Sequence, residues 1–195
     1  TAERQLTRNL AASVIYIGNH MVKGMDVTEG NPAVYIPGQS TEANTNARRV
    51  NKGLASVEIL APYQSSNYNG LQVSLTKQTE NGLTLIGNYT WSKCLDNNST
   101  TTGTYTAINK FDVNANYARC DLNPGQVANI SLVYDLPSFK RFHRVADKLL
   151  NHWQVTTITT LQSGLPFSIS SGVDNSLSGP SGSNDLADLV PGISP

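Results

Sequence analysis

The alternation of apolar and polar residues between Ser66 and Cys94 predicts two β-strands joined by a tight turn. Apolar residues occupy every second position through Leu71–Leu75 and again through Leu83–Trp91. A period of two places each set of side chains on its own face of a sheet. Asn81-Gly82 lies between the two runs, and Asn-Gly favours a two-residue hairpin turn because both of its residues tolerate a positive φ. This stretch is therefore a predicted β-hairpin with one apolar and one polar face.

Two environments are compatible with such a hairpin. In a soluble antiparallel sheet the apolar face packs in a core, whereas in a membrane barrel it faces lipid and its aromatic residues lie at headgroup level. The candidate residues for an aromatic girdle, or for the corresponding core face, are Tyr89, Trp91, Tyr134 and Trp153. The pattern alone leaves both environments open.

The remaining chain predicts more strands and two long connections. Predicted strands cover Thr7–Gly18, Ala55–Pro62, Gln126–Leu136, Asn151–Ser163 and Phe167–Ser171. The stretches His20–Asn51 and Cys94–Gly125 are irregular, and a helical turn is expected at Val145–Leu150. Short turns at one end and long loops at the other are typical of outer-membrane barrels.

The predicted fold class is all-β. We expect an antiparallel β-barrel or barrel-like meander of about seven to eight strands, with long loops at one end. Residues 1–172 are expected to form the β-barrel-like domain, and residues 173–195 a C-terminal tail rich in Gly, Ser and Asn.

The net charge of the chain bears on which electrostatic partners are expected. The 14 basic and 14 acidic residues cancel, so neither a nucleic acid nor an anionic surface is an expected electrostatic partner. Charged residues make up 14% of the chain, and weak repulsion between copies favours self-association. No apolar run approaches the roughly 20 residues of a membrane-spanning helix. The chain begins at Thr1 without an initiator Met, which predicts a mature or trimmed product.

Cys94 and Cys120 flank one of the long connections and are the two cysteines of the chain. Two cysteines at the base of a loop in an exported protein usually form a disulfide. Two free buried thiols are the alternative interpretation. A metal site is less favoured, because neither a CxxC motif nor a nearby pair of histidines accompanies them.

No other set of residues predicts catalysis or cofactor binding. His20, His143 and His152 are scattered, and HExxH, GxSxG and P-loop patterns are missing from the sequence. The oxygen-rich Asp174–Ser176 segment lacks the EF-hand pattern and is typical of a solvated turn. The basic cluster Lys140–Arg144 is typical of a solvated connector. We therefore expect a protein that is not an enzyme and binds neither cofactor nor metal.

Several blocks together resemble one family, the Oar-like TonB-dependent receptors. The blocks occur in this order: NPAVYIPG, ANTNARR, SNYNGLQVSLTK, NGLTLIGNYTWSKCLD, ANISLVYDLP, NHWQVTTITTLQSGLPFSIS and DLVPG. They resemble the C-terminal half of the barrel of these receptors and cover most of the chain. The resemblance implies an outer-membrane barrel that imports a large nutrient with energy delivered through TonB. It also implies a girdle position for Tyr89 and Trp91, a periplasmic turn at Glu80–Gly82 and an extracellular loop at Cys94–Gly125.

The sequence departs from this family in ways that bear on function. Plug and TonB-contacting segments are missing, and large transporters need about 22 strands to enclose their lumen. The first hypothesis is therefore an exported, extracellular or cell-surface subunit that pairs strands with copies of itself to form a filament. The candidate inter-subunit residues are Thr1, Leu6 and Leu10, in a terminal segment; the tail after Gly172 is the other candidate segment. The alternative is a fragment of a receptor in the outer membrane, in contact with its lipid, and a third hypothesis is a soluble ligand-binding domain.

Overall fold

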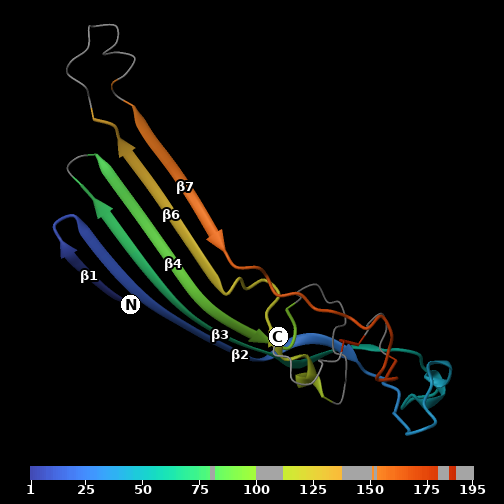
Figure 1. The fold of residues 1–195 in the computed structure, drawn as a ribbon. Helices are drawn as coiled ribbons and strands as arrows, with labels where there is room; N and C mark the ends of the chain where they lie inside the picture. The colour runs from blue at the N-terminus through green and yellow to red at the C-terminus, as the bar shows by residue number, and fades with distance from the viewer. Residues whose placement is uncertain (80–81, 100–111, 138–150, 152, 180–184, 188–195) are drawn as a thin grey trace. The chain divides into compact units, whose positions relative to one another are not determined.

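The computed structural model describes residues 1–195 except for 80–81, 100–111, 138–150, 152, 180–184 and 188–195. The described residues form an antiparallel seven-stranded sheet with short 3-10 turns and long connections (Figure 1). No described helix is both long and apolar enough to cross a membrane. The all-β, barrel-like fold class is confirmed, although the described strands do not close into a barrel.

The strands follow one another across the sheet in the order β1-β2-β3-β4-β6-β7, and the short β5 pairs with β4. Their bounds are Ala2–Thr7 (β1), Leu10–Glu29 (β2), Glu58–Gln78 (β3), Leu83–Asp96 (β4), Ala118–Arg119 (β5), Gln126–Asp135 (β6) and Gln154–Gln162 (β7). Three 3-10 turns cover Glu42–Asn44 (η1), Asn46–Arg48 (η2) and Val113–Asn116 (η3). Neighbouring strands in this order are also mostly neighbours in the chain, which defines a meander.

The chain divides into two compact units. The first, here called the sheet unit, contains Thr1–Gly18, Tyr68–Lys93 and Asn123–Leu165. The second, here called the loop unit, contains Asn19–Asn67, Cys94–Leu122 and Pro166–Pro195. β2, β3 and β4 each contribute residues to both units, and the long connection between β2 and β3 belongs to the loop unit.

The predicted hairpin is present as β3 and β4. Gly82 closes the turn with a φ of 75°, a conformation that glycine adopts without steric cost. A Cβ at Gly82 would also lie 2.7 Å from the Cβ of Asp135. Residues 80–81 of the turn lie outside the described residues, and so does the helical turn expected at 145–150.

Three predicted strand boundaries are wrong. β2 continues to Glu29, whereas an irregular stretch was expected from His20. β3 runs without a break from Glu58 through Pro62 to Gln78, whereas two strands were expected. The unpredicted parts of β2 and β3 carry many polar residues and show no clear apolar alternation. Pairing with neighbouring strands of the sheet fixes their extended conformation. Phe167–Ser171 forms a single bridge, Ser170 to Leu186, where a further strand was expected.

Candidate membrane-facing surface and buried loop cluster

One face of the sheet unit is apolar from strand to strand. In antiparallel pairs, directly opposite residues point to the same side of the sheet, so the register shows which side chains share a face. Across β4, β6 and β7 the apolar rows are Leu83–Tyr134–Val155, Leu85–Leu132–Thr157, Gly87–Ile130–Thr159 and Tyr89–Ala128–Leu161, and Trp91 pairs with Gln126. Thr157 and Thr159 are the polar interruptions on β7. The alternation seen in the sequence is therefore aligned into one continuous surface.

The opposite face carries mainly amides and hydroxyls. Its rows are Thr84–Val133–Thr156, Ile86–Ser131–Ile158, Asn88–Asn129–Thr160 and Thr90–Val127–Gln162. The Thr160 hydroxyl donates a hydrogen bond to Asn129 Oδ1 over 2.8 Å. Four apolar residues interrupt this polar face: Ile86, Val127, Val133 and Ile158. The two faces of the sheet unit thus differ in chemistry, as the walls of a membrane barrel do.

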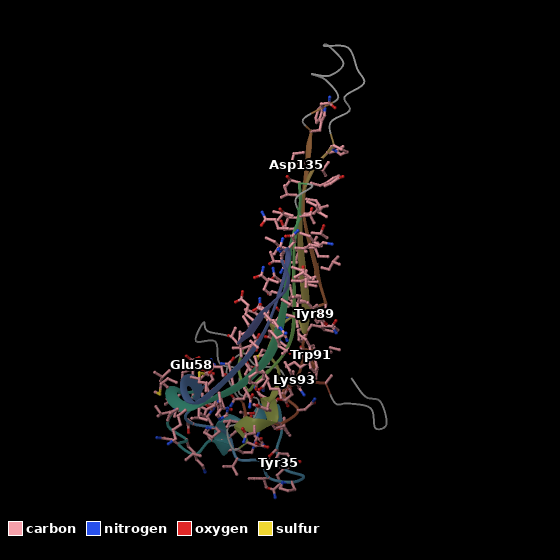
Figure 2. All side chains as sticks on the ribbon, turned by 90° about the vertical axis from the view of Figure 1, so that its left-hand side faces the viewer. Tyr35, Glu58, Tyr89, Trp91, Lys93 and Asp135 are labelled. Carbon is pink, nitrogen blue, oxygen red and sulfur yellow. A yellow bond between two sulfur atoms is a disulfide. The ribbon has the colours of Figure 1, made fainter. Side chains whose placement is uncertain are left out.

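The large apolar side chains of the sheet unit are exposed. Trp91 is 58% exposed and Trp153 62%, and Tyr89 and Tyr134 are exposed as well. Figure 2 labels Tyr89 and Trp91 along β4, with side chains projecting from both faces of the sheet. Among the described residues, Ala33 and Cys120 are the hydrophobic residues with full burial, and both belong to the loop unit. The described part of the sheet unit therefore has no packed hydrophobic core of its own.

The candidate aromatic residues lie at two levels of the apolar face. Val155 of β7 and Leu83 of β4 lie in the same row. Trp153 lies two residues before this row, and Trp91 lies eight residues beyond it, so the two tryptophans are ten residue steps apart along the strands. Ten residue steps correspond to about 34 Å along the strands, or about 26 Å along a membrane normal at a strand tilt of about 40°. An apolar band of about 25 Å between two aromatic girdles is typical of outer-membrane barrels.

The terminal segment around Thr1, Leu6 and Leu10 forms the first edge of the sheet. β1 pairs with β2 of the same chain, from Ala2 opposite Val14 to Thr7 opposite Leu10. Every residue of β1 is exposed, Leu6 to 53%. Within the described strand order, β1 and β7 each have one neighbour, so each presents an unpaired backbone edge.

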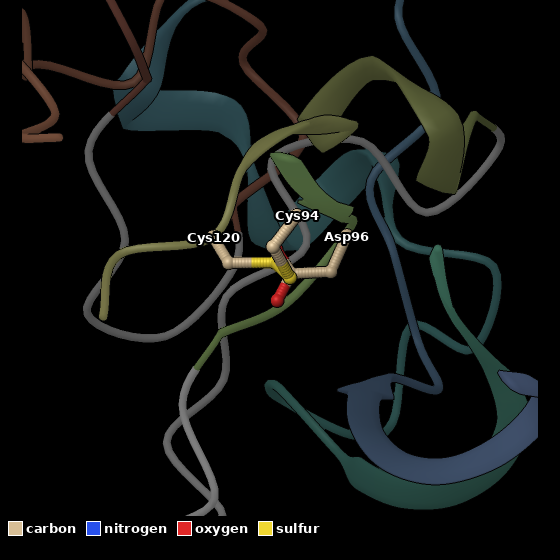
Figure 3. Close-up of side chains that lie close together, drawn as sticks. All are labelled: Cys94, Asp96 and Cys120. Atoms are coloured by element: carbon tan, nitrogen blue, oxygen red, sulfur yellow. A yellow bond between two sulfur atoms is a disulfide. The ribbon is translucent and has the colours of Figure 1, made fainter. Parts of the chain in front are cut away.

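The predicted disulfide between Cys94 and Cys120 is present in the loop unit (Figure 3). It joins Cα atoms 5.3 Å apart over a sequence separation of 26 residues. β5 pairs with the end of β4 next to it, and the Cys120 N–H donates to the Cys94 carbonyl over 3.2 Å. The bridge therefore closes the long connection at its base.

Asp96 lies beside the disulfide, with a carboxylate oxygen within 4.8 Å of both sulfur atoms. Burial raises the pKa of the Asp96 carboxyl, and the negative charge of Asp121 raises it further. The Ser99 hydroxyl opposes this rise by donating to Asp96. Metal ions bind the thiolate form of cysteine, so the oxidised pair does not supply metal ligands here.

The loop unit contains a buried ion pair. Arg49 Nη1 lies 3.4 Å from Glu29 Oε2, and both side chains are almost completely buried. Arg49 also donates to the carbonyl oxygens of Asn31 and Gly179, over 2.6 and 2.7 Å. Neighbouring Arg48 donates to the Val34 carbonyl over 2.6 Å. The two arginines thereby tie segments to one another that are far apart in the sequence.

The Glu29 carboxylate has several donors besides Arg49. The backbone N–H groups of Asn31 and Val57 donate to Glu29 Oε1 over 2.7 and 2.9 Å, and the Ser56 hydroxyl donates to Oε2. Burial alone would raise the pKa of Glu29. The hydrogen bonds and the positive charge of Arg49 outweigh burial, and the pKa is lowered. Glu29 is therefore ionised in a buried position.

The side chain of Asn31 connects both ends of the β2–β3 connection. Its Nδ2 donates to the carbonyl oxygens of Asn51, Leu54 and Ala55, over 2.9 to 3.1 Å. Its Oδ1 accepts from the Asn51 N–H over 2.7 Å. One buried amide thus bonds to four backbone groups of the 51–55 segment.

Sequence reasoning missed this polar cluster. Arg48-Arg49 and Glu29 were visible, but each was part of a predicted irregular stretch, and a pattern of apolar residues does not identify buried polar partners. Of the histidines, His20 lies in β2, whereas His143, His152 and the Lys140–Arg144 cluster lie outside the described residues. The Asp174 carboxylate accepts hydrogen bonds from the Ser176 hydroxyl and the Gly179 N–H, an arrangement typical of a turn.

Comparison with known proteins agrees with this geometry. No curated protein and no solved structure matches the chain. A family model described as an outer membrane beta barrel domain matches residues 1–195, the whole of the chain. The chain belongs to this family of outer membrane beta-barrel domains.

Proposed function

We propose that the chain forms a sector of the wall of a larger outer-membrane receptor barrel, with the apolar face of the sheet unit toward lipid. The observation that carries the proposal is the register-aligned apolar face with aromatic residues at two levels, ten residue steps apart. Both Tyr89 and Trp91 then belong to one girdle, and Tyr134 and Trp153 to the other.

Strand length supports the same orientation. Within the sheet unit, β6 has 10 residues and β7 has 9. The parts of β2, β3 and β4 in this unit are Leu10–Gly18, Tyr68–Gln78 and Leu83–Lys93. A tilted membrane-spanning strand needs about 9–11 residues, which each of these segments supplies.

The unpaired edges of the sheet favour a sector of a barrel wall over a complete barrel. β1 and β7 each lack a second neighbour in the described strand order, and unpaired edge groups are costly in lipid. We expect further strands of the barrel to pair with these edges in the membrane. The sequence resemblance to Oar-like receptors supports a large barrel of this kind, whose function would be TonB-dependent import of a nutrient.

Fluorescence quenching at known depths tests the orientation of the sheet. The chain has two tryptophans, Trp91 and Trp153, so the variants W91F and W153F each keep one. A third variant places a tryptophan at Ile130, in the W91F/W153F background. In bilayers with lipids brominated at different depths, Trp91 and Trp153 are expected to be quenched most by shallow bromines and the residue-130 probe by deep ones.

A matched probe at Asn129 serves as the control, since it lies on the opposite face of the same strand. It is expected to be quenched weakly by any brominated lipid and more strongly by a water-soluble quencher. Equal quenching of the probes at 129 and 130 would contradict the proposed orientation.

Self-assembly through strand pairing is the second candidate function. The fully exposed, one-sided edge of β1 favours it, because such an edge accepts a strand from a second copy. Electron microscopy of detergent-free material should then show regular filaments that disappear when Thr1–Leu10 is deleted. Dispersed particles that require detergent would contradict this candidate and agree with the receptor wall.

A further inference from the structure

A hollow of about 400 Å³ opens in the sheet unit at the level of Trp91. It is lined by Tyr16, Asn69, Gly70, Leu71, Trp91, Ser92 and Lys93, from three adjacent strands. Most of its lining is apolar, and Trp91 and Tyr16 are 58% and 66% exposed. The hollow therefore combines an apolar floor with large aromatic side chains that remain accessible.

The position of the Tyr16 ring follows from the residues beside it. The Tyr16 hydroxyl donates a hydrogen bond to Asn69 Oδ1 over 2.6 Å. Gly18 leaves room for the ring, because a Cβ at Gly18 would lie 3.3 Å from its Cε1 and hydroxyl. The ring is thus held at one end by a polar partner on β3, and the hollow has a defined wall.

Lys93 supplies the charged group of the hollow. It is exposed, and it lies two residues beyond Trp91, at the end of the sheet-unit part of β4. Asn69 and Tyr16, which are hydrogen-bonded to each other, line the same hollow. An apolar floor with a cation beside it matches a ligand that has a hydrocarbon chain and an anionic head.

We propose that this hollow binds one anionic membrane lipid, with an acyl chain on Leu71 between Tyr16 and Trp91 and a headgroup phosphate at Lys93. The inference rests on the proposed function, because it requires the apolar face to point toward lipid. Two arguments select a lipid as the occupant. The hollow is continuous with the apolar face, and its cation lies at a girdle level, where the headgroups of a bilayer are found.

Lipid retention by the full-length protein, purified from outer membranes in mild detergent, tests the proposal. Native mass spectrometry with added phosphatidylglycerol or phosphatidylcholine is expected to show preferential retention of the anionic lipid. K93Q should reduce this retention about tenfold, the effect of losing one charge-assisted hydrogen bond of about 1.4 kcal/mol. K93R should restore it, and L71F should reduce retention of both lipids by filling the hollow.

The control is K77Q, which removes the same charge from an exposed position on β3 that does not line the hollow. Equal loss in K77Q and K93Q, equal retention of the two lipids, or displacement by millimolar inorganic phosphate would overturn the proposal. The depth-quenching measurement distinguishes failure of the lipid site from failure of the proposed receptor wall. Correct depths with unselective lipid retention reject the lipid site alone, whereas tryptophans outside the bilayer reject the receptor wall and the lipid site together.

Discussion

The sheet unit exposes apolar side chains, whereas the loop unit buries polar ones. Ile130 and Trp91 belong to a surface that has no apolar partner among the described residues, while Glu29 and Arg49 are almost completely buried and paired. Exposed apolar surface is favourable only in contact with another apolar medium, and buried charge is tolerated only when it is paired and hydrogen-bonded. The stability of the sheet unit therefore depends on its surroundings, and that of the loop unit on its own internal bonds.

Removing one member of the buried ion pair should produce the largest effect on the loop unit. In R49M the Glu29 carboxylate stays buried without its cation, and about 3–5 kcal/mol of unfolding free energy should be lost. Limited proteolysis of the loops against urea concentration would measure the loss. The control is R8M at an exposed position, which should change the free energy by less than about 0.5 kcal/mol. A similar result for R8M and R49M would show that the ion pair does not stabilise the loops.

Loss of the disulfide should also act mainly on the loop unit. The double variant C94A/C120A frees a connection closed over 26 residues, for which chain entropy predicts a loss of about 3–4 kcal/mol. Proteolysis within this connection should accelerate, while the quenching depth of Trp153 should stay the same. Reductant added to the unmodified protein should reproduce the effect, and an unchanged cleavage rate would contradict the prediction.

A charge placed on either face of β6 tests the sheet unit. I130K places an ammonium group on the proposed lipid face and should destabilise the membrane-inserted protein by about 2–4 kcal/mol. N129K places the same group on the opposite, polar face and should have a much smaller effect. Folding equilibria in lipid vesicles measure both variants. A larger loss for N129K would reverse the assignment of the two faces.

Protonation of Glu29 at acid pH should weaken the loop unit, and this is the smallest effect expected. The pKa of Glu29 is lowered in the folded state, so its contribution is complete above the unfolded pKa and is lost as the pH falls through the folded value. Loop protection from proteolysis by an acid-active protease should therefore decline below about pH 4. E29Q should be less protected at pH 7 and should show a flatter pH dependence. Parallel curves for both proteins would assign the acid sensitivity to another group.

The two units also differ in how far the sequence predicts them. A period of two was enough to identify the faces of β4, β6 and the Leu71–Leu75 part of β3, because in these segments one face is mostly apolar. The disulfide followed from the position of Cys94 and Cys120 around a loop. These predictions depend on local order in the chain, which the sequence displays directly.

The loop unit depends on partners that are distant in the sequence. Arg48 and Arg49 donate to the carbonyl oxygens of Leu177 and Gly179, 129 and 130 residues away. The extension of β2 to Glu29 is fixed by pairing and not by an apolar alternation. No periodic pattern indicates which carbonyl a buried arginine will reach, so the polar cluster could be seen only in the structure.

The bonds of Asn31 have a consequence for which changes this loop can accept. One amide holds both ends of the β2–β3 connection together. The number of residues between these ends therefore does not determine the register of the two strands. Residues added at exposed positions such as Tyr35 or Gln39 would change the outline of the loop without moving β2 against β3. Changes of length and sequence in this loop are therefore compatible with an unchanged sheet.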